Sequence, residues 1–132
     1  MTVKLIRSGT LFKDAPYAYA SVAPPGSLIF TAGACPLDDQ GTVVSPGDVQ
    51  AQASLAVANL AAALAESGAT LADVLKTTVF VASADRADLV AAWDVIRAAF
   101  SDHDAPSTLL GVAVLGYQDQ LVEIEAVAVA PG

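Results

Sequence analysis

The sequence predicts an α+β fold in which two helices cover one face of a mixed sheet. Apolar, β-branched stretches and two helix-like stretches follow one another in the order β-β-β-α-β-α-β-β. At 132 residues, the chain is most simply one domain, residues 1–132, with enough apolar residues for a sizeable core. No internal repeat, low-complexity tract or linker interrupts this order.

Three short strands are predicted in the first quarter of the chain, at residues 4–8, 17–22 and 27–34. Pro24, Pro25 and Gly26 separate the last two, because paired prolines followed by glycine cannot continue a strand ladder. Since only turns separate these strands, we expect them to form an antiparallel meander. An exposed acidic loop should follow at residues 36–44.

The first helix is predicted from residue 45 to residue 67. Ser45 is the expected N-cap, Pro46 the first helical residue, and Asp48 lies in the first turn, where the helix dipole favours an anion. Gly68 suits the position after the last turn. The apolar stripe of this helix consists of Val57, Leu60, Ala61 and Leu64.

A β-branched strand is predicted at residues 74–82, and a second helix follows it. Ser83 is the expected N-cap of that helix, and Pro106 prevents its extension beyond residues 101–104. Helical spacing places one apolar stripe against the sheet, which indicates a core position for its tryptophan. The stripe consists of Leu89, Trp93, Ile96 and Phe100.

The last two strands are predicted at residues 107–115 and 121–129. In the second of these, side chains that alternate with period two place Val122, Ile124, Ala126 and Ala128 on one face. Glu123 and Glu125 lie on the other face with two valines. Carboxylates are costly to bury without partners, so this face should meet water, a binding cleft or another subunit.

Composition restricts the classes of partner. Hydrophobic residues make up 55% of the chain and charged residues 15%, which favours self-association, because large exposed apolar patches are rare on monomers. The formal net charge of −8 repels phosphate backbones, and no cluster of lysine or arginine compensates for it. We therefore expect neither nucleic-acid binding nor adhesion to anionic membranes.

The reactive residues are few. Cys35 is the single cysteine and His103 the single histidine, so we expect no internal disulfide and no cysteine- or histidine-rich metal site. Cys35 ends a strand beside Gly33, where it is either inert packing or part of a cleft. No signal-length or membrane-spanning apolar run is present, which predicts a cytoplasmic protein. No nucleotide- or cofactor-binding motif is present either.

Several segments together resemble the RidA/YjgF family, over roughly residues 3–130. The most specific are the Gly33-x-x-Pro36-Leu37 turn and the Glu123-containing strand. The segments are Ala15-Pro16-Tyr17, residues 28–33 with Pro36-Leu37-Asp38, Asn59-Leu60 with residues 69–78, Ser107-Thr108, and Leu121-Val122-Glu123-Ile124-Glu125-Ala126.

The resemblance implies a chorismate-mutase-like fold and a homotrimer with ligand pockets in the three clefts between subunits. The best-known members hydrolyse reactive enamines and imines and release ammonia without a cofactor. Tyr17 and Glu123 match the family's pocket tyrosine and its water-holding glutamate, and are the predicted catalytic residues. Gly33 and Cys35 are predicted to line the same pocket.

Other pocket positions depart from the family pattern. Pro106 occupies the place of the arginine that binds the substrate carboxylate, Ala32 that of a serine, and Trp93 that of an asparagine. Thr108 matches a position that holds cysteine or threonine, so its backbone N–H could polarise a ligand atom. Arg7 is the one arginine considered as a substitute for the missing cation. The loop at residues 115–120 is about two residues longer than in the family's deaminases.

These residues predict a trimer that binds a small neutral or cationic metabolite and hydrolyses a C=N bond, but is not an efficient 2-imino acid deaminase. A second hypothesis is a non-catalytic small-molecule-binding or chaperone-like module, which the residues at positions 32, 93 and 106 favour and Glu123 and Tyr17 oppose. Ribonuclease activity, a third label attached to relatives, is the weakest hypothesis, because the chain is acidic.

Overall fold

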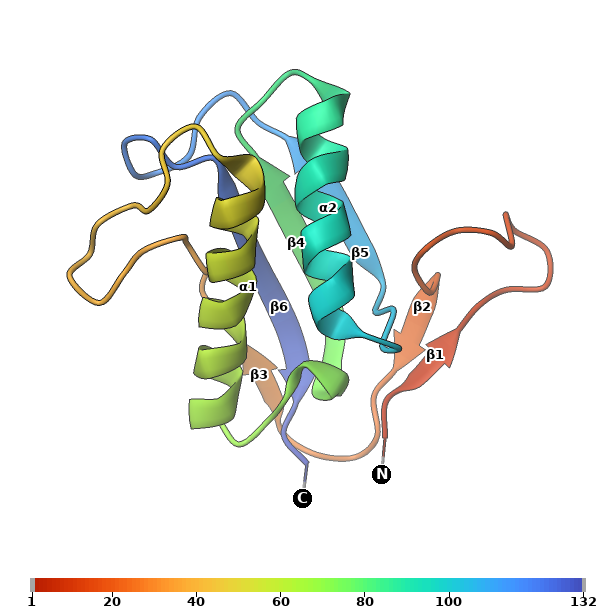
Figure 1. The fold of residues 1–132 in the computed structure, drawn as a ribbon. Coiled ribbons are helices and arrows are strands. Elements are labelled where there is room, and N and C mark those ends of the chain that lie inside the picture. Colours follow the sequence, from red (N-terminus) through yellow and green to blue (C-terminus); the bar gives the residue numbers. More distant parts are fainter. Residues whose placement is uncertain (1, 132) are drawn as a thin grey trace.

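The computed structural model describes residues 2–131, and the predicted order of elements is confirmed (Figure 1). The helices are α1 (Val49–Glu66) and α2 (Arg86–Phe100), and a short 3-10 turn, Leu71–Asp73, leads into the fourth strand. The strands are β1 (Lys4–Ile6), β2 (Ala20–Val22), β3 (Leu28–Phe30), β4 (Val74–Val81), β5 (Ser107–Gly111) and β6 (Val122–Val129).

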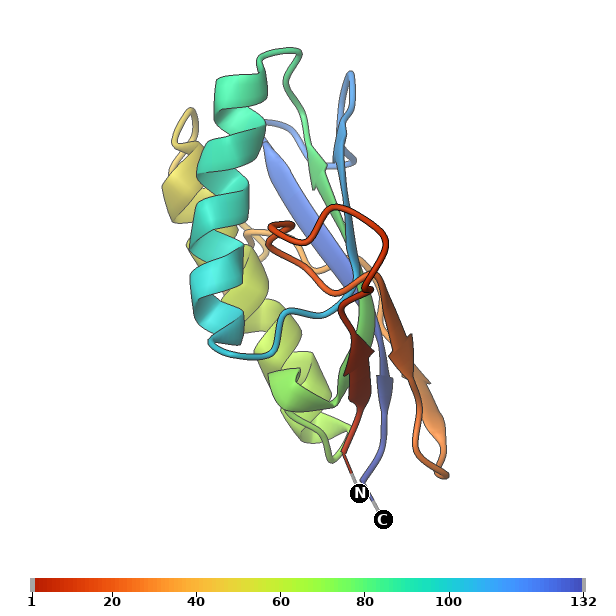
Figure 2. The same ribbon diagram turned by 90° about the vertical axis from the view of Figure 1, so that its right-hand side faces the viewer.

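The main sheet has four strands in the order β3-β6-β4-β5. The pair β4–β5 is parallel and is connected through α2, whereas β6 runs antiparallel to both β3 and β4. Both helices lie on the same side of this sheet, and its other side is left open (Figure 2). The predicted α+β class, with two helices on one face of a mixed sheet, is confirmed.

The predicted meander of the first three strands is wrong. β1 pairs with β2 in a separate two-stranded sheet, whereas β3 pairs with β6, where Leu28 lies opposite Val129. Pro24 and Pro25 have no N–H to continue a ladder with β2, so the chain after them is free to join another strand. The period-two pattern identifies a strand but not its partner, and β6 is the long aliphatic strand beside it.

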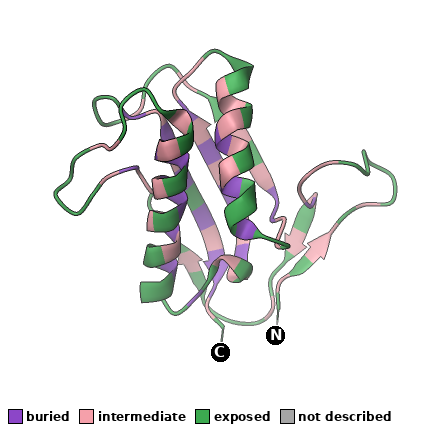
Figure 3. Ribbon diagram, viewed as in Figure 1, coloured by how far each residue is buried: buried purple, intermediate pink, exposed green. Residues whose placement is uncertain are grey.

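The core lies between the helices and the sheet (Figure 3). On β6, the four residues of the predicted inner face, from Val122 to Ala128, are buried, whereas Glu125 is exposed and Glu123 half-buried. The predicted orientation of this strand is therefore confirmed. Leu60 and Leu64 of α1 are fully buried against the same face.

The start of α1 differs from the prediction. Ser45 has a φ of 47° and opens a turn in which its carbonyl accepts the N–H of Asp48 (3.0 Å). Asp48 is the N-cap, and its Oδ1 accepts the N–H of Ala51 (3.0 Å). Pro46 therefore belongs to the turn before the helix, because the better acceptor for the first helical N–H groups lies two residues further on.

The N-cap of α2 is Asp85 and not Ser83. Asp85 Oδ1 accepts the N–H of Ala87 (2.9 Å), while the Ser83 hydroxyl accepts the N–H of Asp85 (3.0 Å) and donates to Asp88 (2.7 Å). The serine thus orders the approach to the helix without capping it.

Four strands are shorter than predicted by two or more residues: β1 ends at Ile6, β2 begins at Ala20, β3 ends at Phe30 and β5 ends at Gly111. Past β3, the chain still follows β6, and Ala34 forms an isolated bridge with Ile124. Within residues 2–131, no helix is long and apolar enough to cross a bilayer.

Candidate functional site

Glu123 projects from β6 on the open side of the sheet, beside the segment that continues β3. The bridge between Ala34 and Ile124 has two backbone hydrogen bonds, of 2.6 and 3.1 Å, and brings Gly33 against Glu123. A Cβ atom at Gly33 would overlap the Glu123 carboxyl group. Position 33 therefore lacks a side chain because the carboxylate occupies that space, and the turn requires no left-handed backbone there.

Two side chains donate hydrogen bonds to the Glu123 carboxylate. Cys35 Sγ lies 3.3 Å and Gln120 Nε2 lies 3.2 Å from Oε1. Burial, and then the hydrogen bond and charge of Glu123, raise the pKa of the Cys35 thiol to about 11, although Gln120 acts in the opposite direction. The thiol is therefore neutral at physiological pH and a poor nucleophile, and it serves as a donor to the glutamate.

An open groove of about 690 Å³ runs between the β3 edge of the sheet and α1. Three of the predicted pocket residues, Ala32, Gly33 and Cys35, line it, together with Tyr117 of the loop before β6. Asn59 of α1 also lines the groove, and its Nδ2 donates to the carbonyls of Cys35 (2.8 Å) and Leu37 (3.0 Å). The helix thus fixes the strand end that carries the thiol.

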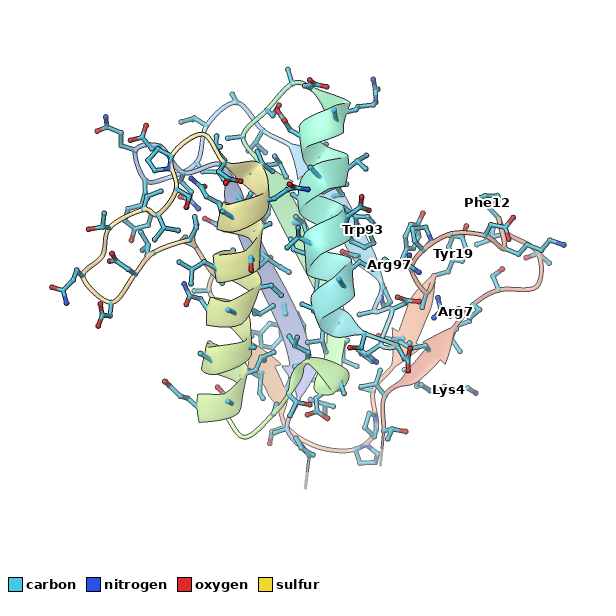
Figure 4. All side chains as sticks on the ribbon, viewed as in Figure 1. Lys4, Arg7, Phe12, Tyr19, Trp93 and Arg97 are labelled. Atoms are coloured by element: carbon cyan, nitrogen blue, oxygen red, sulfur yellow. The ribbon has the colours of Figure 1, made fainter. Side chains whose placement is uncertain are left out.

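The other predicted residues lie at the opposite edge of the sheet, along β5. Tyr17 and Trp93 line a depression of about 370 Å³ with Ser107 and Leu109. Trp93 is half-buried and projects from α2 toward the side where β1 and β2 lie, so its predicted core position is wrong (Figure 4). The residue that fills the core at this level is Ala92.

Position 106 offers no positive charge. Pro106, which directly precedes β5, is buried, and its carbonyl accepts the N–H of Thr77 on β4 (3.0 Å). Thr108 lies on the open face, where its hydroxyl accepts a hydrogen bond from Lys76 Nζ (2.6 Å). The sequence analysis did not single out Lys76. Lys76 lies two residues before Thr78 on the same strand, so the two side chains share a face.

Arg7 is engaged elsewhere. Its guanidinium lies 2.9 Å from Asp104 Oδ2, and Arg97 lies 3.5 Å from the other oxygen of the same carboxylate. These residues lie beside β1 and the end of α2, and Figure 4 shows Arg7 and Arg97 on that flank. Within the described chain, Arg7 therefore has an acidic partner and is not a free cation for a ligand.

The predicted site residues thus form two separate groups. Glu123 faces Phe80 of β4, and Phe80 faces Leu110 of β5, so two strand spacings, about 9.5 Å, lie between the Glu123 backbone and the β5 edge. The first group is Glu123, Gly33, Cys35 and Ala32, and the second is Tyr17, Trp93, Pro106 and Thr108. Within residues 2–131, no group of three or more histidine, cysteine or carboxylate side chains gathers as a metal site would require.

Comparison with known proteins defines the class first. A solved Yersinia pestis structure of the conserved Rid family has a TM-score of 0.91 and 30% identity, covering 98% of this chain and 99% of that one. The solved structure of Escherichia coli TdcF with bound serine has a TM-score of 0.67 and 32% identity, covering 98% of each chain. The fold is therefore that of the Rid proteins.

Sequence comparison then gives the family. A RutC family protein of Synechocystis is 37% identical over 99% of both chains. A 2-iminobutanoate/2-iminopropanoate deaminase of Salmonella typhimurium is 34% identical over 89% of this chain and 93% of its own length. Residues 12–130 also match the family profile described as endoribonuclease L-PSP. The chain belongs to this family, the RidA/YjgF family.

Proposed function

We propose that the chain forms a homotrimer whose inter-subunit clefts bind a small neutral or cationic metabolite and hydrolyse a C=N bond in it. The observation that carries this proposal is the separation of the site into two groups at opposite edges of one sheet. If copies pack edge to edge, the Glu123 group of one subunit meets the Tyr17 group of the next. Each cleft then contains both predicted catalytic residues.

The open sheet face supports assembly. It exposes apolar side chains from both edge strands: 73% of Phe30, 51% of Leu28 and 43% of Leu110. Exposed apolar area of this kind is typical of an interface. Small-molecule binding is supported by TdcF, whose solved structure holds serine, and by the relative named as a deaminase.

The proposed reaction is the addition of water across C=N. Glu123 holds the water and takes one of its protons while the oxygen bonds to the imine carbon and the π electrons move to nitrogen. The nitrogen takes up a proton, and the resulting carbinolamine loses ammonia to leave a carbonyl compound. Tyr17 orients the ligand. The backbone N–H of Thr108 is directed at the Thr77 carbonyl in the parallel β4–β5 ladder, so no role in stabilising the developing charge is assigned to it. No cofactor is needed for these steps.

Pro106 narrows the substrate class. A charge-assisted hydrogen bond contributes roughly 1.5–3 kcal/mol, so its absence weakens binding of a carboxylate by about 10- to 150-fold. Arg7 does not compensate, because it pairs with Asp104. Substrates that carry a carboxylate beside the C=N bond should therefore be poor ones.

The alternative is a non-catalytic small-molecule-binding or chaperone-like module. Ala32 and Pro106 favour it, because neither side chain can hydrogen-bond a ligand. The Glu123 carboxylate, held by two donors, opposes it. Ribonuclease activity remains the weakest candidate despite the family profile's description, since a net charge of −8 repels RNA.

The test is ammonia release from 2-iminobutyrate, compared with a carboxylate-free imine produced in situ by a flavin amine oxidase. We expect turnover of the carboxylate-free imine at the higher kcat/KM, and its loss in Glu123→Gln. Efficient 2-iminobutyrate turnover that both Glu123→Gln and Arg7→Ala reduce would contradict the assignment of Pro106. A metabolite that raises the melting temperature without being turned over would favour the binding module.

Assembly is tested separately by sedimentation velocity. The expected mass is about three times the 13.3 kDa of one chain. A monomer at assay concentration would overturn the shared cleft.

A further inference from the structure

Gln120 has an unusual environment for a glutamine that directly precedes a strand. It is only 3% exposed. Its Nε2 donates to the carbonyl of Val122 (3.1 Å) and to Glu123 Oε1 (3.2 Å), and its Oε1 accepts the N–H of Tyr117 (3.1 Å). Both ends of the amide are therefore occupied, which fixes the orientation of the group that contacts the glutamate.

A second buried glutamine holds the backbone on either side of Gln120. Gln52 of α1 is fully buried, and its Oε1 accepts the N–H of Leu121 (2.7 Å) while its Nε2 donates to the carbonyl of Asp119 (2.9 Å). Asp119 has a φ of 66°, a conformation that the bond to Gln52 helps to hold. The helix thus sets the position of the loop, and the loop sets the position of the Gln120 amide.

The two carboxylate oxygens of Glu123 have different surroundings. Both side-chain donors, Cys35 and Gln120, bind Oε1. Oε2 lies above Gly33, and no side chain or N–H group of residues 2–131 donates a hydrogen bond to it. Oε1 is therefore used in holding the carboxylate, and Oε2 is the oxygen that can bind a further donor.

We infer that Gln120 is a positioning residue for Glu123, which fixes the carboxylate by Oε1 so that Oε2 is the atom that holds the water. The inference rests on the proposed function for its catalytic consequence, but the arrangement itself can be tested without turnover. Gln120 touches no substrate in this scheme and acts through Glu123. Its loss should lower kcat more than it raises KM, because the water and not the ligand is displaced.

The chain provides a reporter for this arrangement. Cys35 is the only cysteine, so its alkylation by iodoacetamide is read by intact mass. Glu123 disfavours the thiolate and Gln120 favours it. At a fixed pH of about 8.5, Glu123→Gln should therefore alkylate faster than the natural chain. Gln120→Met should alkylate more slowly, whereas a variant that is merely loosened would expose the thiol and alkylate faster.

The decisive experiment measures Gln120→Met and Gln120→Glu against Gln118→Met, an exposed position on the same loop. We expect Gln120→Met to lose about 10-fold or more in kcat for the carboxylate-free imine, with slower alkylation and little change in KM. In Gln118→Met, kcat and the alkylation rate should stay at the level of the natural chain. Gln120→Glu keeps the shape of the amide but replaces the N–H donor by a carboxyl group. Above the pKa of that group the variant has no donor and should behave like Gln120→Met. Below this pKa the protonated carboxyl group can donate, so kcat and the alkylation rate should recover toward those of the natural chain. Besides Cys35, the titratable groups around this arrangement are Glu125, two residues from Glu123 on the same face of β6, and Tyr117, which lines the groove with Gly33 and Cys35.

The outcomes separate the two claims. If the natural chain hydrolyses no imine but alkylation slows in Gln120→Met and accelerates in Glu123→Gln, the proposed function fails and the positioning of Glu123 stands. If turnover depends on Glu123 while Gln120→Met keeps full kcat or alkylates faster, the positioning inference is overturned. If Gln120→Met does not fold, Gln120→Glu decides by the same two readouts.

Discussion

The two edges of the main sheet are built differently. At the β3–β6 edge, one carboxylate is held by a thiol and an amide, and Asn59 and Gln52 of α1 hold the segments that carry these two groups. At the β5 edge, Tyr17 comes from a loop and Trp93 is half-buried on the outer side of α2. One chain completes the first half of the candidate site by itself. The second half is an open surface that another chain can complete.

The largest effect on stability should come from Gln52→Leu. The change leaves the carbonyls of Ser45 and Asp119 and the N–H of Leu121 without their partner, which should cost about 3 kcal/mol of unfolding free energy. Urea unfolding measures it, and Gln50→Leu, at an exposed position of the same helix, is the matched control. Equal stability of the two variants would show that the β3–β6 edge does not depend on this amide.

Gly33→Ala should break the same edge at the carboxylate. The added methyl group overlaps Glu123, so the side chain must leave its position. We expect a loss of about 30-fold or more in imine turnover, comparable with about 2 kcal/mol, and only a modest fall in melting temperature. Gly116→Ala is the control, because nothing lies within 4 Å of a Cβ there. Full activity in Gly33→Ala would show that the observed position of the Glu123 side chain is not the catalytic one.

Trp93→Ala examines the other edge. A fully buried tryptophan costs about 3–5 kcal/mol when truncated, so a half-buried one at an open surface should cost about 1–2 kcal/mol in the isolated chain. If the β5 edge is closed by another subunit, the trimer should weaken as well. Sedimentation velocity across a dilution series measures this, with Val90→Ala, an exposed position of α2, as control. Unchanged assembly would leave Trp93 outside the interface.

The smallest effect concerns the Cys35 thiol. Its pKa is about 11, against an ordinary value of 9.0, so the neutral thiol is favoured in the folded chain. The contribution to stability is therefore fully present below about pH 9 and is lost as the pH rises through 11. Urea unfolding of the natural chain and of Cys35→Ala between pH 8 and 11 should show a small difference that narrows with rising pH. A difference that widens with rising pH would contradict the conclusion that Glu123 raises the pKa of the Cys35 thiol.

Local pattern was sufficient for the elements and for the faces of β6. The alternation from Val122 to Ala128 separates buried aliphatic residues from the glutamates, and helical spacing places Leu60 and Leu64 in the core. The local pattern gave wrong predictions where a neighbouring residue competed for the same cap or core position. Asp48 caps α1 in place of Ser45, and Trp93 lies outside the core although it shares a stripe with Ile96.

The sequence alone determined the order of the strands and helices, the acidic character that disfavours nucleic acid, and the candidate residues Glu123, Tyr17 and Pro106. The order of the elements and the acidic character follow from composition and from spacing along the chain, whereas the candidate residues come from the resemblance to the family. Only the tertiary structure decided that β3 joins β6, that Arg7 is bound to Asp104, and that Cys35 and Gln120 donate hydrogen bonds to the Glu123 carboxylate. Those contacts join residues far apart in the sequence or depend on the direction of a side chain. They form only between groups that the folded chain brings close together, which the linear sequence does not specify.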